Sequence, residues 1–284
     1  MEKNKTIILV VVCIVIICVA GIIFLNTGVD TDYKNNGNTA NKTEPDNGAY
    51  LIEDRDTKYK QTEITPNMKP YFKVGETFVY EQTGNGGDPE SGAIERMKFI
   101  FKVEGIERIN KTDYYIVSHV GNSSFFFKGS KGEPHSIEQT WVFKHYISVE
   151  TGKFLKTNAE FYVTRDGFVS PKEIDEVIVP ENKQLTYNLM VIYYLWMLSL
   201  DENFKIETTD EKGVMKDEFE FIGTDTLNGR ECFKVKKRTT NIRTNEVLSI
   251  DNMWVDKQRR ILLKSEHYED RIKMSEIELV STIN

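Results

Sequence analysis

The sequence predicts a mainly β domain of the α+β class. A curved antiparallel sheet, or half-barrel, is expected from two repeated halves wrapped round a central apolar helix, with one further transmembrane helix at the N-terminus. Three observations predict this fold. Segments of alternating apolar and polar residues recur along the chain, the pattern of residues 101–117 returns at residues 219–235, and the apolar segment 182–200 has helical spacing.

Composition limits the class of the protein. The chain has 284 residues, of which 39% are hydrophobic and 29% charged, so it can build one large domain or two small ones. With 37 Lys and Arg against 44 Asp and Glu, the formal net charge is −7. A general nucleic-acid binder needs a basic surface for phosphate contacts, so we expect no nucleic-acid partner.

The first element is a candidate membrane anchor. The run from Thr6 to Leu25 contains no charged residue and, at 1.5 Å rise per residue, spans about 30 Å as a helix. A cleaved signal peptide is the alternative, but its apolar region is usually only about 7–15 residues long. Two lysines precede the run and the first charges after it are acidic. By the positive-inside rule, residues 1–5 are cytoplasmic and the C-terminal part is extracytoplasmic, which places the protein in the cell membrane.

A polar tether follows the anchor. Residues 26–69 are rich in Asn, Thr, Asp and Lys and contain too few apolar residues to build a core, so the folded domain is expected at residues 70–284. Cys232 is the one cysteine outside the span, which leaves no intramolecular disulfide; we expect a buried core residue, with a reactive thiol as the alternative. Three sequons are either glycosylation sites or chance patterns, at Asn41, Asn110 and Asn122.

The first half of the folded domain consists of predicted strands. Residues 71–81 alternate apolar and polar side chains, as a half-buried strand does, and a Gly-rich loop follows at residues 84–92. Because the alternating segments are short and separated by turn residues, we expect neighbouring strands to pair antiparallel. The further segments are 97–103, 113–119, 140–147 and 154–163.

The second half repeats the first. Residues 101–117 align without a gap with residues 219–235, and each copy contains an Asn where a tight turn needs a residue that tolerates positive φ. The repeated halves are therefore expected at about residues 71–165 and 214–281. The match resumes in two further places, where Trp141 aligns with Trp254 and Leu155 with Leu263.

The segment between the halves is predicted to be the helix. Apolar residues in 182–200 are spaced three and four apart, and others fill the opposite side, so the helix would be apolar nearly all round. Helices of this kind are usually buried. Its expected place is against the concave face of the curved sheet.

Three segments resemble one family of carriers. Residues 73–80, 227–235 and 254–266 look like the opening strand, a central strand and the Trp-Val-Asp hairpin of the LolA/LolB/LppX-like and RseB-like half-barrels. Arg259 and Arg260 stand where that hairpin usually has a Gly, and a membrane-spanning anchor replaces a free or lipid-anchored carrier. The resemblance implies binding of acyl chains or of an apolar peptide between sheet and helix, without catalysis.

The resulting hypothesis is a non-enzymatic extracytoplasmic binding protein for a lipid, a lipoprotein or another apolar ligand. The alternative is a cell-envelope sensor or interaction module with a filled core, which contacts a membrane-protein partner. An open cavity of several hundred Å³ would favour the first hypothesis and a packed interior the second. The expected cavity liners are Trp141, Leu189, Tyr193, Trp196, Met197 and Trp254.

Two further features are candidate contact surfaces. Lys234, Lys236 and Arg238 alternate along a predicted strand and share one face, which is either a solvent-facing edge or a contact for an anionic lipid or glycan. A run of aromatic residues cannot point inward as a whole, so one ring faces a partner or lipid, or the run is buried under a loop. This run consists of Phe125, Phe126 and Phe127.

Motifs for catalysis are missing from the sequence. The four histidines form neither an HExxH pattern nor a close HxH pair, and there is no G-x-S-x-G elbow. The Gly-rich loops lack the G-K-[ST] ending of a phosphate-binding loop. We therefore expect no metal site, no cofactor and no enzymatic activity.

Overall fold

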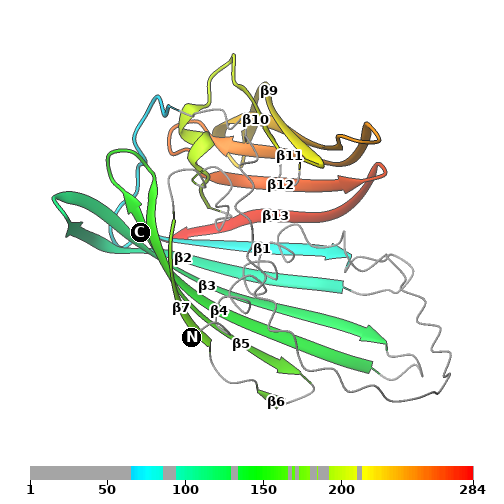
Figure 1. Ribbon diagram of the computed structural model, residues 1–284, viewed down its shortest axis with the longest axis horizontal. Helices are drawn as coiled ribbons and strands as arrows, with labels where there is room; N and C mark the ends of the chain where they lie inside the picture. Colours follow the sequence, from blue (N-terminus) through cyan, green and yellow to red (C-terminus); the bar gives the residue numbers. More distant parts are fainter. Residues whose placement is uncertain are drawn as a thin grey trace, which may run out of the picture.

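The computed structural model describes residues 65–85, 94–128, 134–165, 168–169, 173–179, 184, 192–209 and 213–283. These residues form one antiparallel, curved sheet with 13 strands (Figure 1). The predicted anchor at residues 6–25 and most of the predicted tether lie outside the described residues. Within the described part, no helix has both the length and the apolar character needed to cross a membrane.

The strand order places the second half of the chain beside the first. From one edge the order is β6-β5-β4-β3-β2-β1-β13-β12-β11-β10-β9-β8, and β7 pairs with β5. The strands of the first half are β1 (Thr77–Asn85), β2 (Ile94–Ile109), β3 (Thr112–Lys128), β4 (Pro134–Ser148), β5 (Phe154–Arg165), β6 (Phe168–Val169) and β7 (Glu173–Ile178). Those of the second half are β8 (Lys205–Thr209), β9 (Met215–Leu227), β10 (Arg230–Asn241), β11 (Glu246–Asp256), β12 (Leu262–Glu269) and β13 (Ile272–Ile283).

Alternation of side chains explains why these segments are strands. On β2, Met97, Phe99, Phe101 and Val103 are buried, whereas the lysines between them, Lys98 and Lys102, are exposed. Successive side chains of a strand point to opposite faces, so one face of β2 joins the core and the other meets solvent. The inner face of the sheet carries the core, and the outer face carries most of the charged residues.

The predicted central helix is wrong, and the α+β class with it. Among the described residues of the segment 182–200, only Leu195–Ser199 is helical, as the 3₁₀ turn η2, and the flanking Tyr194 and Leu200 are extended. The described part of the protein is therefore all-β. The described end of the segment, residues 192–200, packs between the halves: the amide of Leu262 donates to the carbonyl of Ile192, and residues 195–198 are buried.

The two halves share a hydrogen-bond pattern. The bulge between Val103 and Gly105 on β2 recurs between Phe221 and Gly223 on β9. In each half the strand pair ends in a turn with two positive-φ residues, at Asn110-Lys111 and at Asn228-Gly229. Bulges bend a strand and increase its twist, so the same curvature is produced in both halves.

The two halves also share the conformation of a second turn, between β4 and β5 in the first half and between β11 and β12 in the second. The turns that begin at Ser148 and Asp256 both reverse the chain through a residue with positive φ, Gly152 (70°) or Arg260 (58°). The amide of that residue donates to the carbonyl of the first residue of its turn at 2.9 Å in both halves. Arg260 is therefore the residue that takes the place of the usual Gly.

Register within the sheet changes one part of the sequence alignment. Trp254 lies opposite Lys264, one pair before a bulge between β11 and β12, and Tyr146 lies opposite Lys156, one pair before the matching bulge between β4 and β5. Trp141 lies farther from that bulge on β4. The structural equivalent of Trp254 is thus Tyr146, and not the Trp141 that the sequence match suggested.

The halves meet at β1 and β13, in the middle of the sheet (Figure 1). Beside this junction, the guanidinium of Arg259 binds both carboxylate oxygens of Glu76, which is almost fully buried. The hydroxyl of Tyr80 on β1 donates to the carbonyl of Leu262 at 2.6 Å. Polar contacts thus connect the start of the first half to the β11–β12 turn of the second.

Candidate functional site

Four of the expected cavity liners lie in the packed interior. Tyr193 and Met197 have exposed fractions of 1% and 0%, and Trp141 and Trp196 are also buried. Trp196 packs against the rings of Phe204 and Phe219, with centroids 5.7 and 5.2 Å apart. All four side chains belong to the packed hydrophobic core of the described residues.

The remaining two liners do not join them. Leu189 lies outside the described residues. Trp254 is on the outer face of the sheet, where its ring nitrogen donates to Asp225 at 3.2 Å. The ammonium groups of Lys234 and Lys264 lie 5.4 and 5.7 Å from its ring centroids, a cation–π arrangement. The six predicted residues therefore do not line one cavity.

The outer face of the second half carries a regular row of cations. Lys234, Lys236 and Arg238 occupy alternate positions of β10 and so share one face, with neighbours about 7 Å apart by strand geometry. On β11, Asn252 stands opposite Lys236 and Ile250 stands opposite Arg238. The register therefore places a polar and an apolar side chain beside the row.

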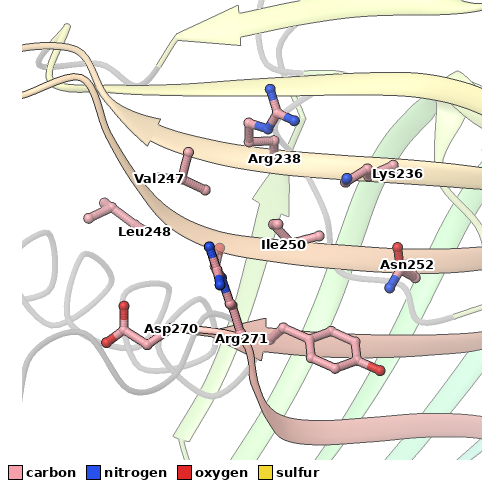
Figure 2. Close-up of a pocket in the computed structure, with 10 residues that line it drawn as sticks. Lys236, Arg238, Val247, Leu248, Ile250, Asn252, Asp270 and Arg271 are labelled. Carbon is pink, nitrogen blue, oxygen red and sulfur yellow. The ribbon is translucent and has the colours of Figure 1, made fainter.

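An open groove of about 540 Å³ lies over this part of the outer face (Figure 2). Tyr268 of β12 stands opposite Ile250 and extends its floor. The side chain of Arg271, from the turn between β12 and β13, reaches over the groove in Figure 2. The lining residues are Lys236, Arg238, Val247, Leu248, Ser249, Ile250, Asn252, Tyr268, Asp270 and Arg271.

The groove cations differ from their neighbours in their partners. Elsewhere on this face Lys216 pairs with Glu218 at 3.3 Å, and Lys234 lies 3.5 Å from Asp225. Lys264 and Lys273 both contact Glu276, at 3.1 and 2.7 Å. Among the described residues, no carboxylate lies within ion-pair distance of the three groove cations. These are Lys236, Arg238 and Arg271.

This arrangement is suited to binding an anion. Two guanidinium groups offer planar forks that bind a carboxylate or phosphate through paired hydrogen bonds, and Lys236 adds a point charge. Lys236 and Arg238 belong to the row that the sequence indicated. Arg271, Asn252 and Tyr268 were missed; the Asp270-Arg271 pair between two alternating segments was the one available signal for the turn that presents Arg271.

The inner face of the second half carries a network of charged residues that pair with one another. The ammonium of Lys237 lies 3.4 Å from Asp217 and 3.9 Å from Asp251. The ring of His267 contacts Asp251 at 2.7 Å and Glu269 at 3.2 Å. Burial disfavours both cations, but these carboxylates outweigh it and raise the pKa of Lys237 and the pKa of His267. No group of three or more potential metal ligands occurs within the described ranges.

The matching inner face of the first half holds two neutral histidines. The indole N–H of Trp141 donates to His119 Nε2 at 3.3 Å, so the proton of His119 is on Nδ1. His145 Nδ1 contacts the hydroxyl of Thr157 at 3.0 Å. Burial lowers the pKa of His119 well below its usual value, and it lowers the pKa of His145 to about 3. The second nitrogen of each ring has no hydrogen-bond partner among the described residues.

The other predicted contact and modification sites are spread over the molecule. Phe125, Phe126 and Phe127 belong to β3, but their side chains lie outside what the structure describes. Cys232 is fully buried, and its thiol contacts the carbonyl of Asp225 at 3.3 Å. Asn110 is in the β2–β3 turn and Asn122 is exposed on β3, whereas Asn41 lies outside the described residues.

Comparison with known proteins finds structural similarity without a sequence family. No protein-family model matches the chain, and no curated protein matches it. A β-barrel-like protein of a domain of unknown function, DUF1849, from Brucella abortus has 9% identity and a TM-score of 0.44, with 74% of this chain and 97% of that one covered. A protein from Bacteroides fragilis, described as exported and YmcC-like in fold, has 13% identity and a TM-score of 0.31, with coverage of 76% and 100%.

A third solved structure is also similar. A domain from Vibrio parahaemolyticus, described as an outer membrane lipoprotein-sorting protein, has 10% identity and a TM-score of 0.20, with 74% of this chain and 85% of that one covered.

Proposed function

We propose that the protein is a membrane-anchored, extracytoplasmic binding module without catalytic activity, and that its groove binds the acidic group of a ligand. Support for the anchor and for the extracytoplasmic placement comes from the sequence, through the uncharged run at residues 6–25 and the charges that flank it. Support for the binding role comes from the outer face of the second half.

A single observation carries the proposal: one groove of an acidic chain is lined by three cations that have no ion-pair partner among the described residues. Lys236, Arg238 and Arg271 line it together, and the formal net charge of the chain is −7. A surface cation gains modest free energy from a neighbouring carboxylate, and most lysines of this face have one. The groove cations remain available to an external anion.

The packed interior favours this site over a cavity beneath the sheet. Tyr193, Trp196 and Met197, which were expected to line such a cavity, are almost fully buried against other side chains. A lipid held there would first have to displace core contacts. The outer groove requires no such rearrangement.

The test uses the full-length protein purified in detergent, with tripolyphosphate as the anionic probe in isothermal titration calorimetry. We expect the wild type to bind tripolyphosphate and the double variant Arg238→Ala/Arg271→Ala to bind at least tenfold more weakly. The double variant Arg108→Ala/Arg243→Ala removes two exposed arginines that do not line the groove, so it is the charge-matched control and should bind like the wild type. Equal affinities in all three proteins, or no binding to the wild type, would refute the groove as the site.

A further inference from the structure

The shape and chemistry of the groove point to one class of acidic ligand. Resting on the anion-binding role proposed above, we propose that the groove binds a short linear acidic oligosaccharide, with its acidic groups on the cations and its sugar rings on the floor.

The length of the groove favours an extended ligand over a single anion. Its lining on β11 runs from Val247 to Asn252, which is about 16 Å at 3.3 Å per residue. Lys236 and Arg238 are about 7 Å apart by the same geometry, and Arg271 adds a third cation from another turn. One small anion reaches only part of this set. A linear chain with repeated acidic groups reaches more of it.

The floor of the groove suits a sugar ring. Tyr268 and Ile250 present apolar surface, which can pack against the C–H face of a sugar. Asn252 lies beside them, and its amide can donate to one hydroxyl and accept from another. A carbohydrate combines apolar faces with hydroxyls at their rims, so this mixed floor complements it.

The surroundings of the groove are less suited to an anionic membrane surface. Glu218 and Glu220 of β9 stand opposite Arg238 and Lys236, and Glu276 lies on the same outer face. A plane of anionic headgroups would approach these carboxylates together with the cations and would be repelled by them. A narrow chain in the groove meets the three cations and one lining carboxylate, Asp270, without covering the flanking glutamates.

The experiment compares oligosaccharides on full-length protein in detergent. The probes are tetragalacturonate and a heparin-derived tetrasaccharide, with monomeric galacturonate and neutral maltotetraose as references. At least one acidic tetrasaccharide should bind ten times more tightly than the monomer, and maltotetraose should not bind. If neither acidic tetrasaccharide exceeds the monomer, the oligosaccharide inference is overturned.

A variant of the floor separates sugar recognition from charge attraction. Asn252→Ala should weaken binding of the acidic tetrasaccharide by a factor at least five times larger than its effect on tripolyphosphate binding. Equal effects on both probes, or no effect on the tetrasaccharide, would contradict recognition of the sugar.

Two further probes distinguish failure of this inference from failure of the proposed function. Vesicles of phosphatidylglycerol and phosphatidylcholine, or a single-stranded DNA oligonucleotide, should bind more weakly than the tetrasaccharide. If either binds more tightly in an Arg238-dependent manner, the anion site stands and the oligosaccharide is rejected. If no anion binds, both proposals fail.

Discussion

Arg260 has in the second half of the sheet the backbone conformation that Gly152 has in the first. Both residues have positive φ and both donate their amide to the first carbonyl of their turn. An L side chain in this region costs about 1–2 kcal/mol, so the second half tolerates a strain that the first half avoids. The difference follows from the neighbours: the Arg260 guanidinium donates to the carbonyl of Leu200 at 2.7 Å, whereas Gly152 packs directly against other side chains.

Gly152→Ala should destabilise the protein strongly. A Cβ at this position would overlap the hydroxyl of Tyr193 and lie 2.6 Å from Leu198 Cδ1, in addition to the strain of positive φ. Overpacking and strain together should lower the free energy of unfolding by about 3 kcal/mol or more, measured by urea denaturation. Arg260→Gly is the control, because its relief of strain and its lost hydrogen bond offset each other to within about 1 kcal/mol. Similar losses of unfolding free energy in Gly152→Ala and Arg260→Gly would contradict this prediction.

The ion pair between Glu76 and Arg259 should be a major stabilising contact. Arg259 binds both carboxylate oxygens of Glu76, and the arginine also lies 5.0 Å from the ring centroid of Phe78. Removing one partner leaves the other as a buried unpaired charge, so Arg259→Ala should cost about 3–5 kcal/mol of unfolding free energy. The exposed pair Arg108–Asp113 provides the control, and Arg108→Ala should leave the urea midpoint unchanged. A small loss at Arg259 would show that the pair is hydrated.

Exchanging one turn residue between the halves should change stability in opposite directions. Lys111 has φ of 71° where the second half has Gly229 with φ of 75°. Lys111→Gly should raise the free energy of unfolding by about 1 kcal/mol because Gly has no Cβ to strain, and Gly229→Lys should lower it by a similar amount. Thermal unfolding of both variants checks whether Lys111→Gly stabilises the protein and Gly229→Lys destabilises it. Destabilisation by Lys111→Gly would mean that the flexibility of Gly in the unfolded chain outweighs the relief of strain.

His145 should make the protein less stable in acid. Burial lowers its folded-state pKa from 6.5 to about 3, so between these values the unfolded chain binds a proton that the folded chain does not. The stability present above about pH 6.5 is then lost as pH falls, by up to about 1.4 kcal/mol per pH unit for this one group. His145→Phe should flatten the fall between about pH 6 and 4, as measured by urea denaturation at several pH values.

The histidine of the second half provides the opposite control. The carboxylates beside His267 raise its pKa in the folded protein. The protonated ring therefore stabilises the fold at pH values below the pKa of His267 in the unfolded chain. This contribution is lost as the pH rises through the raised pKa of the folded state. His267→Phe should therefore reduce stability chiefly at low pH. An unchanged pH profile in both variants would show that carboxylates alone set the acid response.

Strands with one buried face were predictable from the sequence, and the segment between the halves was not. The alternation around Phe99 and Phe101 reflects one face in the core and one in solvent, which is a local property. Residues 192–200 are apolar on all sides because both halves of the sheet enclose them. An apolar pattern of this kind does not distinguish a buried helix from buried extended chain with a 3₁₀ turn, and tertiary packing decides.

The sequence predicted the part of the candidate site that lies on one strand, but not the residues that neighbouring strands contribute. The alternate spacing of Lys236 and Arg238 shows that they share a face. Their neighbours Asn252, Tyr268 and Arg271 come from other strands and a turn, so finding them requires the pairing register. The sequence match paired Trp254 with Trp141, five residues from its structural equivalent Tyr146. The bulges that reveal the correct pairing are not marked in the sequence.

The central place of β13 makes the two halves depend on the end of the described chain. Its residues, 272–283, bridge β12 and β1, and within the described sheet the backbone strand pairing between the halves is that of β13 with β1. A protein truncated before Ile272 would therefore not lose a peripheral strand but split into two half-sheets, each with a long unpaired edge. During synthesis the other strands leave the ribosome before β13 does. Until β13 pairs with β1 and β12, the unpaired edges of these two strands can aggregate.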